Sequence, residues 1–228
     1  MKKGFTLAEV LITLAIIGIV ATMTIPTLIN KYQEKITVTK VKKMYSTLSQ
    51  AYGFYLAEND KAEYIFSGDE GSAEKVFKIF EPYLKVSEDC TSSGTKNCFS
   101  PENYYTKDSN LWVADFYDQT KEHYQIRLND GSAILFKGSD AANKDTAQSL
   151  FQAYYDTNGK DFPNTLGKDA FIFIFDHNGT IPYSPAEGMV NNCIKGSGHS
   201  CAGWIVMNSN MEYLHCPDKL SWEKTTCN

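Results

Sequence analysis

The stretch Gly4-Phe5-Thr6-Leu7-Ala8-Glu9 opens an apolar run that continues to Ile29. Glu9 is the one charged residue in that run. About 25 residues in a helix, at roughly 1.5 Å each, are long enough to cross a hydrocarbon core about 30 Å thick. The sequence therefore predicts a membrane-spanning helix near the N-terminus, and the rest of the chain follows it.

The residues that flank this run are ordered differently from those of a secretory signal. Lys2 and Lys3 form a positive n-region. A small-residue cleavage site should then follow the apolar core. The sequence instead has Asn30-Lys31-Tyr32-Gln33-Glu34 there, and the small residue, Gly4, comes before the core.

The segment Lys2-Lys3-Gly4-Phe5-Thr6-Leu7-Ala8-Glu9-Val10-Leu11 resembles the N-terminus of the type IV pilin and type II secretion pseudopilin superfamily. The resemblance implies that a prepilin peptidase cuts between Gly4 and Phe5 on the cytoplasmic side and N-methylates Phe5. It implies that Pro26 loosens the apolar helix. It also implies three kinds of partner: other pilin or pseudopilin subunits in a helical filament, the peptidase, and an assembly platform in the membrane.

Glu9 is costly in this position, because a carboxylate near the bilayer centre costs roughly 3 kcal/mol on insertion scales. After cleavage the ammonium of Phe5 lies one turn away on the same helix and, in a stack of helices, near the Glu9 of a neighbour. The resemblance favours the neighbour, so that Glu9 neutralises an adjacent Phe5 amine and sets the axial register. The alternative is a Glu9 close enough to the interface to stay hydrated.

Charge and composition set the topology and the class of the remaining chain. The 228 residues carry a formal charge of −5, and this acidic balance predicts no nucleic-acid surface. Lys2 and Lys3 hold the N-terminus in the cytoplasm, so the C-terminal part lies outside, in a periplasmic or extracellular filament after assembly. We expect a leader at residues 1–4, a transmembrane and filament-core helix at 5–29, its amphipathic continuation at 30–58, and one exported globular domain at 59–228.

The amphipathic continuation is indicated by an apolar stripe with helical spacing: Val41, Tyr45, Leu48, Tyr52 and Tyr55. A coiled-coil stalk is the alternative, but its seam prefers aliphatic residues to aromatic ones. Beyond it we expect a short helix from Ser72 to Leu84 that stops around Pro82. After it we expect two hairpins, 124–128 with 133–136 and 171–175 with 180–181. Two further strands are expected at 204–207 and 211–214. One long helix packed on a mainly antiparallel sheet is an α+β, pilin-like fold.

Six cysteines, all in the exported part, suit an oxidising compartment. None forms a C-x-x-C pair, which argues against zinc. Loop-closure entropy favours near neighbours. The spacing therefore predicts Cys90–Cys98, Cys193–Cys201 and, by remainder, Cys216–Cys227, with a Cys193–Cys216 crossing left open.

The loop from Asp156 to Asp169 has oxygen ligands around a glycine, as calcium prefers. The candidate ligands are Asp156, Asn158, Asp161 and Asp169. The spacing departs from an EF-hand, since Gly159 is fourth in the loop and no Glu closes it. Asx and glycine residues also form turns without any metal. Calcium is the one cofactor that the sequence suggests.

No catalytic constellation is visible in the sequence. His123, His177, His199 and His215 are scattered, and the common motifs for nucleophiles, zinc, phosphate and dinucleotides do not occur. We therefore expect a non-enzymatic structural subunit of a type IV pilus-like or type II secretion filament. The alternative is a membrane-anchored binding or enzymatic domain that never polymerises. The sequence does not distinguish a pilus, a pseudopilus and a DNA-uptake filament.

Overall fold

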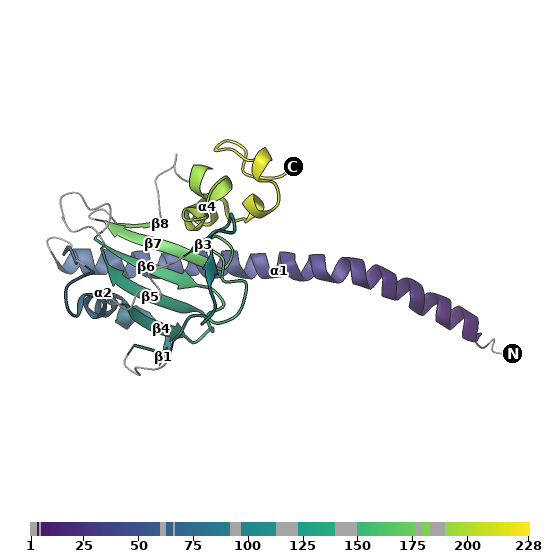
Figure 1. The fold of residues 1–228 in the computed structure, drawn as a ribbon, viewed down its shortest axis with the longest axis horizontal. Helices are drawn as coiled ribbons and strands as arrows, with labels where there is room; N and C mark the ends of the chain where they lie inside the picture. The colour runs from purple at the N-terminus through teal and green to yellow at the C-terminus, as the bar shows by residue number, and fades with distance from the viewer. Residues whose placement is uncertain are drawn as a thin grey trace. The chain divides into compact units, whose positions relative to one another are not determined.

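The computed structural model describes residues 4, 6–59, 63–65, 67–91, 97–112, 123–139, 150–176, 179–182 and 190–228. Its longest element is helix α1, Leu7–Glu58, of 52 residues (Figure 1). The chain divides into two compact units, Met1–Thr37 and Val38–Asn228, which we describe separately. α1 is therefore the one helix shared by both units, as the predicted continuation of the apolar helix requires.

In the second unit a six-stranded sheet forms the centre, with the order β1-β4-β5-β6-β7-β8 and every neighbouring pair antiparallel. The strands are β1 Val86–Asp89, β4 Tyr124–Leu128, β5 Ala133–Gly138, β6 Phe151–Asp156, β7 Ala170–Asp176 and β8 Gly179–Pro182. The two predicted hairpins are β4–β5 and β7–β8, and they share this sheet. β1 and β6 were not predicted. A small hairpin of β2 (Tyr104–Tyr105) and β3 (Leu111–Trp112) completes the strands.

The main hydrophobic core lies on the face of the sheet that the second half of α1 covers. Val41, Leu48 and Tyr52 of the predicted stripe are buried, and Tyr45 and Tyr55 are partly buried against the same core. The ring of Tyr52 meets Phe151 and Phe175 edge to face, with centroids 5.5 and 5.2 Å apart. Edge-to-face aromatic pairs add to the gain from burial. The stripe therefore packs on the sheet, as expected for a pilin-like fold.

Helix α2, Ser72–Phe80, packs on the same core through Val76, Phe77 and Phe80. It is followed by the 3-10 turn η1, Glu81–Tyr83, which contains Pro82. The predicted helix to Leu84 therefore ends a turn earlier, because proline cannot donate the backbone hydrogen bond that an α-helix needs.

The segment Trp204–Met207 was predicted as a strand, and this prediction is wrong: Cys201–Asn208 form helix α4. Residues 211–214 are also not a strand, since Glu212–Leu214 form the 3-10 turn η4. The periodicity of a short apolar run does not distinguish a buried strand from a buried helix. Here Cys201 to Ile205 are all buried, so the helix has no polar face to give a helical period. Ser209 ends α4 in the left-handed conformation (φ 55°).

A second, smaller core lies on the other face of the sheet. It contains Leu135, Tyr154, Ile172 and the Cys90–Cys98 disulfide, with the ring of Trp112 packed against it. The remaining disulfides are Cys193–Cys201 and Cys216–Cys227, so the cysteines pair as their spacing predicts. Each disulfide closes a short loop of the second unit. Part of the first loop, residues 92–96, lies outside the described residues.

Candidate functional site

The N-terminal end of α1 is built by Thr6 and Glu9. The Thr6 backbone N–H and the Thr6 hydroxyl each donate to Glu9 Oε2 at 2.8 Å, and the Glu9 N–H donates to Thr6 Oγ1 at 3.3 Å. This reciprocal pairing is a capping box, which satisfies backbone donors that a helix start leaves free. Our sequence reasoning missed the role of Thr6, although the pattern Thr-x-x-Glu before an apolar run is its signal.

The capping box uses only one oxygen of the Glu9 carboxylate. Both bonds from Thr6 end on Oε2, and Oε1 has no hydrogen-bond partner among the residues that the structure describes. Phe5, whose amine is the predicted partner of Glu9, lies outside those residues. Glu9 can therefore close the helix start and still present an oxygen to a cation.

The first half of α1 presents apolar side chains on every side. Leu7, Leu14, Val20 and Ile29 are all exposed, with Leu7 79% and Ile29 49% accessible. The hydroxyls in this stretch bond backward within the helix: Thr13 to the Val10 carbonyl and Thr22 to the Ile19 carbonyl. Such bonds satisfy polar groups where water is absent. Among the described helices, α1 is the one long and apolar enough to cross a membrane by length and composition.

Pro26 and Gly4 are the other predicted residues of this segment. α1 continues through Pro26 without ending. Proline lacks the N–H that would bond four residues back, so one hydrogen bond of the helix is missing there. Gly4 is exposed, and a Cβ added to it would meet nothing within 4 Å. The fold itself therefore does not require glycine at position 4.

The loop from Asp156 to Asp169 is organised by its two end carboxylates. Asp156 Oδ1 accepts the N–H groups of Asn158 and Gly159 at 3.0 and 2.8 Å. The Tyr104 hydroxyl donates to Asp156 Oδ2 at 2.6 Å. Gly159 has φ of 70°, and a Cβ there would lie 2.6 Å from the Gly131 carbonyl oxygen, so this turn requires glycine.

Asp169 holds the other end of the loop in the same way. Its two oxygens accept the N–H groups of Asn164 and Thr165 at 2.8 and 2.6 Å. Asn164 in turn donates through its side-chain amide to Ser100 Oγ at 2.9 Å. The loop is thus tied to the segment that leads into β2.

Burial changes the protonation of this acidic pair. Asp156 has no exposed surface, and Asp169 is 3% exposed. Burial, and then the nearby charge of Asp169, raises the pKa of Asp156 to about 8. Burial raises the pKa of Asp169 to about 6, against the backbone hydrogen bonds that it accepts. Two carboxyls that share a buried region resist simultaneous ionisation.

The four predicted calcium ligands differ in their surroundings: Asp156 and Asp169 act on each other, Asn158 lies beside Asp169, and Asp161 stands apart at the surface. Asp161 is exposed at the surface of the loop, whereas Asp156 and Asp169 are buried. Among the described residues, the acids of this loop do not place three ligand atoms within 4.8 Å of one another. Each oxygen of Asp156 and Asp169 already accepts a hydrogen bond from the protein. Calcium binding by this loop stays a prediction, which a calcium titration would test.

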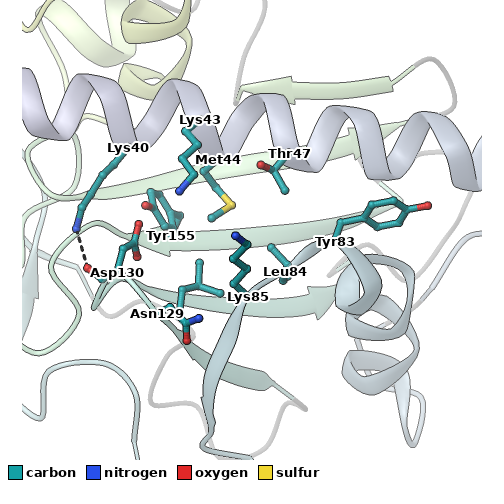
Figure 2. A pocket seen from close by; sticks show the side chains of 11 residues that line it. Lys40, Lys43, Met44, Thr47, Tyr83, Leu84, Lys85, Asn129, Asp130 and Tyr155 are labelled. Carbon is teal, nitrogen blue, oxygen red and sulfur yellow. Dashed lines mark hydrogen bonds between the residues drawn. The ribbon is translucent and has the colours of Figure 1, made fainter.

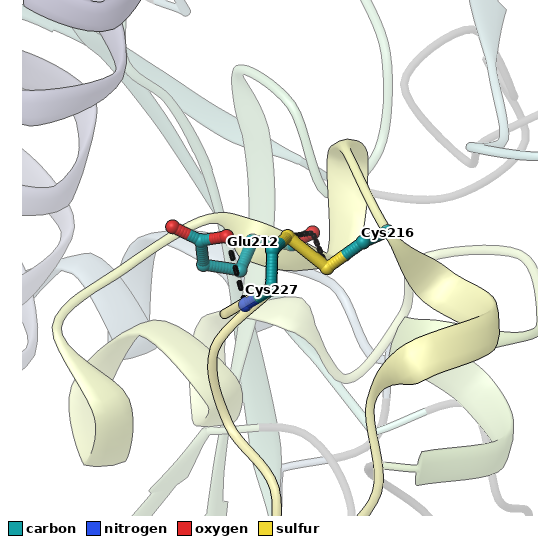
Figure 3. A group of neighbouring side chains, drawn as sticks. All are labelled: Glu212, Cys216 and Cys227. Carbon is teal, nitrogen blue, oxygen red and sulfur yellow. Dashed lines mark hydrogen bonds between the residues drawn. A yellow bond between two sulfur atoms is a disulfide. The ribbon is translucent and has the colours of Figure 1, made fainter.

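One group in the described residues has the spacing of metal ligands: Glu212, Cys216 and Cys227 (Figure 3). The two sulfurs are joined in a disulfide, so no thiolate is available to a metal. Glu212 instead accepts the N–H of Cys227 through Oε2 at 3.3 Å. The group fastens the C-terminal segment to η4.

The described histidines lie next to different elements. His123 precedes β4, His199 precedes α4, and His215 follows η4. His199 Nδ1 lies 2.6 Å from the hydroxyl of Ser197, two residues away, and burial lowers the pKa of His199. This contact belongs to a local turn, because side chains two residues apart can meet without any contact between distant parts of the chain. His177 lies outside the described residues.

Comparisons with known proteins match two parts of the chain. The prokaryotic N-terminal methylation motif, the signal of type IV prepilins and pseudopilins, matches residues 1–25. The family of unknown function DUF6613 matches residues 27–191, which is more than half of the chain. Neither the comparison with curated proteins nor that with solved structures found a match.

Proposed function

Because the chain belongs to the DUF6613 family of unknown function and begins with a prokaryotic N-terminal methylation motif, we propose that it is a structural filament subunit. The filament is of the type IV pilus or type II secretion class. The precursor is held in the cytoplasmic membrane by the apolar half of α1 and is cut after Gly4 by a prepilin peptidase. The peptidase then methylates the amine of Phe5.

The observation that carries this proposal is the apolar surface of α1 from Leu7 to Ile29. These side chains are exposed on all sides of the helix and include one charge, Glu9. An apolar surface of this size is stable in lipid or against other apolar helices, and unstable in water. Because this helix is stable both in lipid and against other apolar helices, it can leave the bilayer when the helices of neighbouring subunits replace the lipid.

The capping box gives Glu9 a defined role in that exchange. Oε2 holds the first turn of α1 through Thr6, and Oε1 is left to accept a bond from the methylated Phe5 ammonium of an adjacent subunit. A paired carboxylate and ammonium remove most of the cost of burying either charge in an apolar medium. The pairing also fixes how far one subunit is shifted along the filament relative to the next.

The second unit forms the exported part of the subunit. Three disulfides and a six-stranded sheet stabilise it for display on a filament surface. Identical subunits joined by head-to-tail contacts that do not close generate an open helical filament. The platform in the membrane and the peptidase are the further partners of this pathway.

Mass spectrometry of the chain purified from its membrane or filament fraction tests the proposal. We expect an N-terminal peptide that begins with N-methylated Phe5. An intact Met1, or a cut after Asn30, would contradict it. Pelleted filaments built from the mature chain are the second expected result. A processed chain that stays membrane-bound and never sediments as filaments would favour an anchored binding or enzymatic domain instead.

A further inference from the structure

A cavity of about 330 Å³ lies in the second unit, between α1 and the sheet (Figure 2). Its apolar wall is formed by Met44, Leu84 and Leu128. Lys43 enters it from α1, and Lys85 enters it from the segment before β1. Figure 2 shows that both side chains extend into the space between the helix and the sheet, with their ammonium ends beside Met44.

Among the described residues that line the cavity, Asp130 is the one acid, and the charges of Lys40 and Lys43 both act on it. The ammonium groups of Lys43 and Lys85 make no side-chain hydrogen bond or ion pair in the described residues. The third lysine, Lys40, is already used, since its Nζ donates to the carbonyls of Asp130 and Thr157 at 3.2 and 2.7 Å. Cations that share a concavity repel one another, so the cavity is suited to an anion.

Asp130 supplies one negative charge to the cavity. Its Oδ1 accepts the backbone N–H and the hydroxyl of Ser132, as part of the turn between β4 and β5, and these neutral donors leave its charge in place. With Lys40, Lys43 and Lys85 against this one acid, the lining carries more positive than negative charge. The apolar wall beside the lysines favours an anion carried on a short apolar stem, such as the side chain of Asp or Glu.

An acidic group lies in the turn before α2 and in the first turn of α2, where the charge of Glu74 acts on Lys78. Asp69 and Glu70, in the turn before α2, and Glu74, in its first turn, are exposed. They make no ion pair in the described residues. α2 and η1 separate this acidic turn from the cavity, which begins at Tyr83. One subunit thus carries an excess of positive charge at the cavity and an excess of negative charge at the acidic turn.

We propose that the lysine cavity of one copy of this chain receives the acidic turn of a second copy, Asp69-Glu70 with Glu74. The proposal rests on the filament function proposed above and names one contact within it. The two surfaces differ, so the contact is heterologous and can repeat along a filament without closing. Matching opposite charges in this way sets register and suppresses wrong contacts.

Zero-length cross-linking tests the contact directly. Isotope-labelled and unlabelled full-length chains are mixed, assembled or concentrated in detergent, and treated with a carbodiimide, which joins an amine to a carboxylate that touches it. We expect peptides joining Lys43 or Lys85 of one isotope to Asp69, Glu70 or Glu74 of the other. Cross-links from these lysines exclusively to other acids would overturn the proposal.

Charge exchange supplies the second measurement. Lys43→Glu with Lys85→Glu should lower the pelleted filament by about tenfold, and so should Asp69→Lys with Glu70→Lys. All four changes together should restore it. The matched control, Lys160→Glu with Lys168→Glu, alters net charge equally at exposed sites of another loop and should assemble normally.

The outcomes separate this contact from the filament function itself. Filaments with methylated Phe5 that tolerate all these charge reversals would overturn the contact and leave the function standing. If the wild type never forms filaments, the cross-links in detergent still decide whether the contact exists. Loss of binding to anionic phospholipid vesicles in the Lys43→Glu, Lys85→Glu variant, without a cross-link to the acidic turn, would assign the cavity to lipid headgroups and overturn the proposal.

Discussion

Glu9 caps the start of α1 and, in the proposed filament, also pairs with the Phe5 ammonium of a neighbouring subunit; substitutions can separate the two roles. Glu9→Ala removes both the capping box and the charge, whereas Glu9→Gln keeps an oxygen that Thr6 can bond. We expect both variants to be inserted and cut, because Gly4 and the apolar run are unchanged. Both should yield at least tenfold less pelleted filament, since a neighbouring Phe5 ammonium loses its counter-charge.

The Gln variant decides which role matters for assembly. A capping box typically contributes about 0.5 to 2 kcal/mol, and glutamine supplies most of it. If Glu9→Gln assembles like the wild type and Glu9→Ala does not, helix capping explains the effect and the inter-subunit charge pair is refuted. Filament yield normalised to processed chain is the quantity to compare.

Asp156 makes stability depend on pH in an unusual direction. Its folded-state pKa is raised to about 8 and that of Asp169 to about 6, whereas an unfolded Asp titrates near 3.9. Between these values the folded state binds more protons than the unfolded state, so the free energy of unfolding falls as pH rises. We expect the melting temperature of the full chain in detergent to decrease from pH 5 to pH 8.

Replacing the carboxyl by an amide should remove much of that dependence. Asp156→Asn keeps an oxygen for the N–H groups of Asn158 and Gly159, and its amide can donate to the Tyr104 hydroxyl. The variant should gain stability relative to the wild type at pH 8, by an amount of order a few kcal/mol at most. Asp161→Asn, an exposed change in the same loop, is the control. An unchanged pH profile in Asp156→Asn would show that the buried pair does not titrate as described.

At the scale of the secondary elements, the C-terminal segment is closed by one covalent link, the Cys216–Cys227 disulfide. Cys216 and Cys227 close a loop with a sequence separation of 11, which contributes about 2 to 3 kcal/mol in the chain-entropy model. Trp222 lies in that loop and is exposed. We expect Cys216→Ser with Cys227→Ser to be cut by chymotrypsin after Trp222 at least tenfold faster than the wild type.

The rest of the fold should survive this change. The segment is also held by Asn210, whose side-chain amide donates to the Thr225 carbonyl at 3.1 Å, so loosening is local. The far-ultraviolet circular dichroism of the double variant should match that of the wild type. Equal cleavage rates in the two proteins would mean that the disulfide does not protect this segment.

The elements that could be predicted from sequence are those with a regular pattern. The stripe from Val41 to Tyr55 has a helical period, and the turns Asn129-Asp130-Gly131 and Asp176 to Gly179 separate clear strands. β6 was missed because it lies in the middle of the sheet with buried residues on both faces, which removes the alternation of apolar and polar residues. α4 was taken for a strand because Cys201 to Ile205 are all buried, which leaves that part of the helix without a polar face.

In the candidate site, residues that lie in a local motif could be predicted from sequence, whereas partners distant in sequence could not. Gly4, Phe5 and Glu9 could be recognised because they lie within one local motif. The partner of Asp156 could not, since Tyr104 is 52 residues away and meets it only when β2 folds back on the sheet. The calcium prediction treated 14 neighbouring residues as one ring of ligands, roughly the length of a known loop type. The structure buries Asp156 and exposes Asp161, a difference in burial that the spacing could not show, and calcium binding stays a prediction.

For the whole molecule, the proposed function depends on a change from membrane-bound precursor to filament subunit, and in this proposal cleavage after Gly4 controls that change. A Cβ added at position 4 would meet no atom of the described residues within 4 Å, so we expect Gly4→Leu to fold and insert normally. We expect the variant to keep residues 1–4, because a bulky residue before the scissile bond obstructs the peptidase. Gly4→Ala, which adds one methyl group, should still be cut at a measurable rate.

The uncut chain should remain in the membrane and form no filaments, for an electrostatic reason. Without cleavage Phe5 has no ammonium, so Glu9 of a neighbouring subunit has no counter-charge in the apolar core, and Lys2 and Lys3 would have to leave the cytoplasmic side. Mass spectrometry of the N-terminal peptide and sedimentation of filaments give the two readouts. If the Gly4→Leu chain stays uncut and still forms filaments, cleavage does not control assembly. If it stays uncut, forms none and keeps the biological activity of the wild type, the protein acts as an anchored domain and the filament function is wrong.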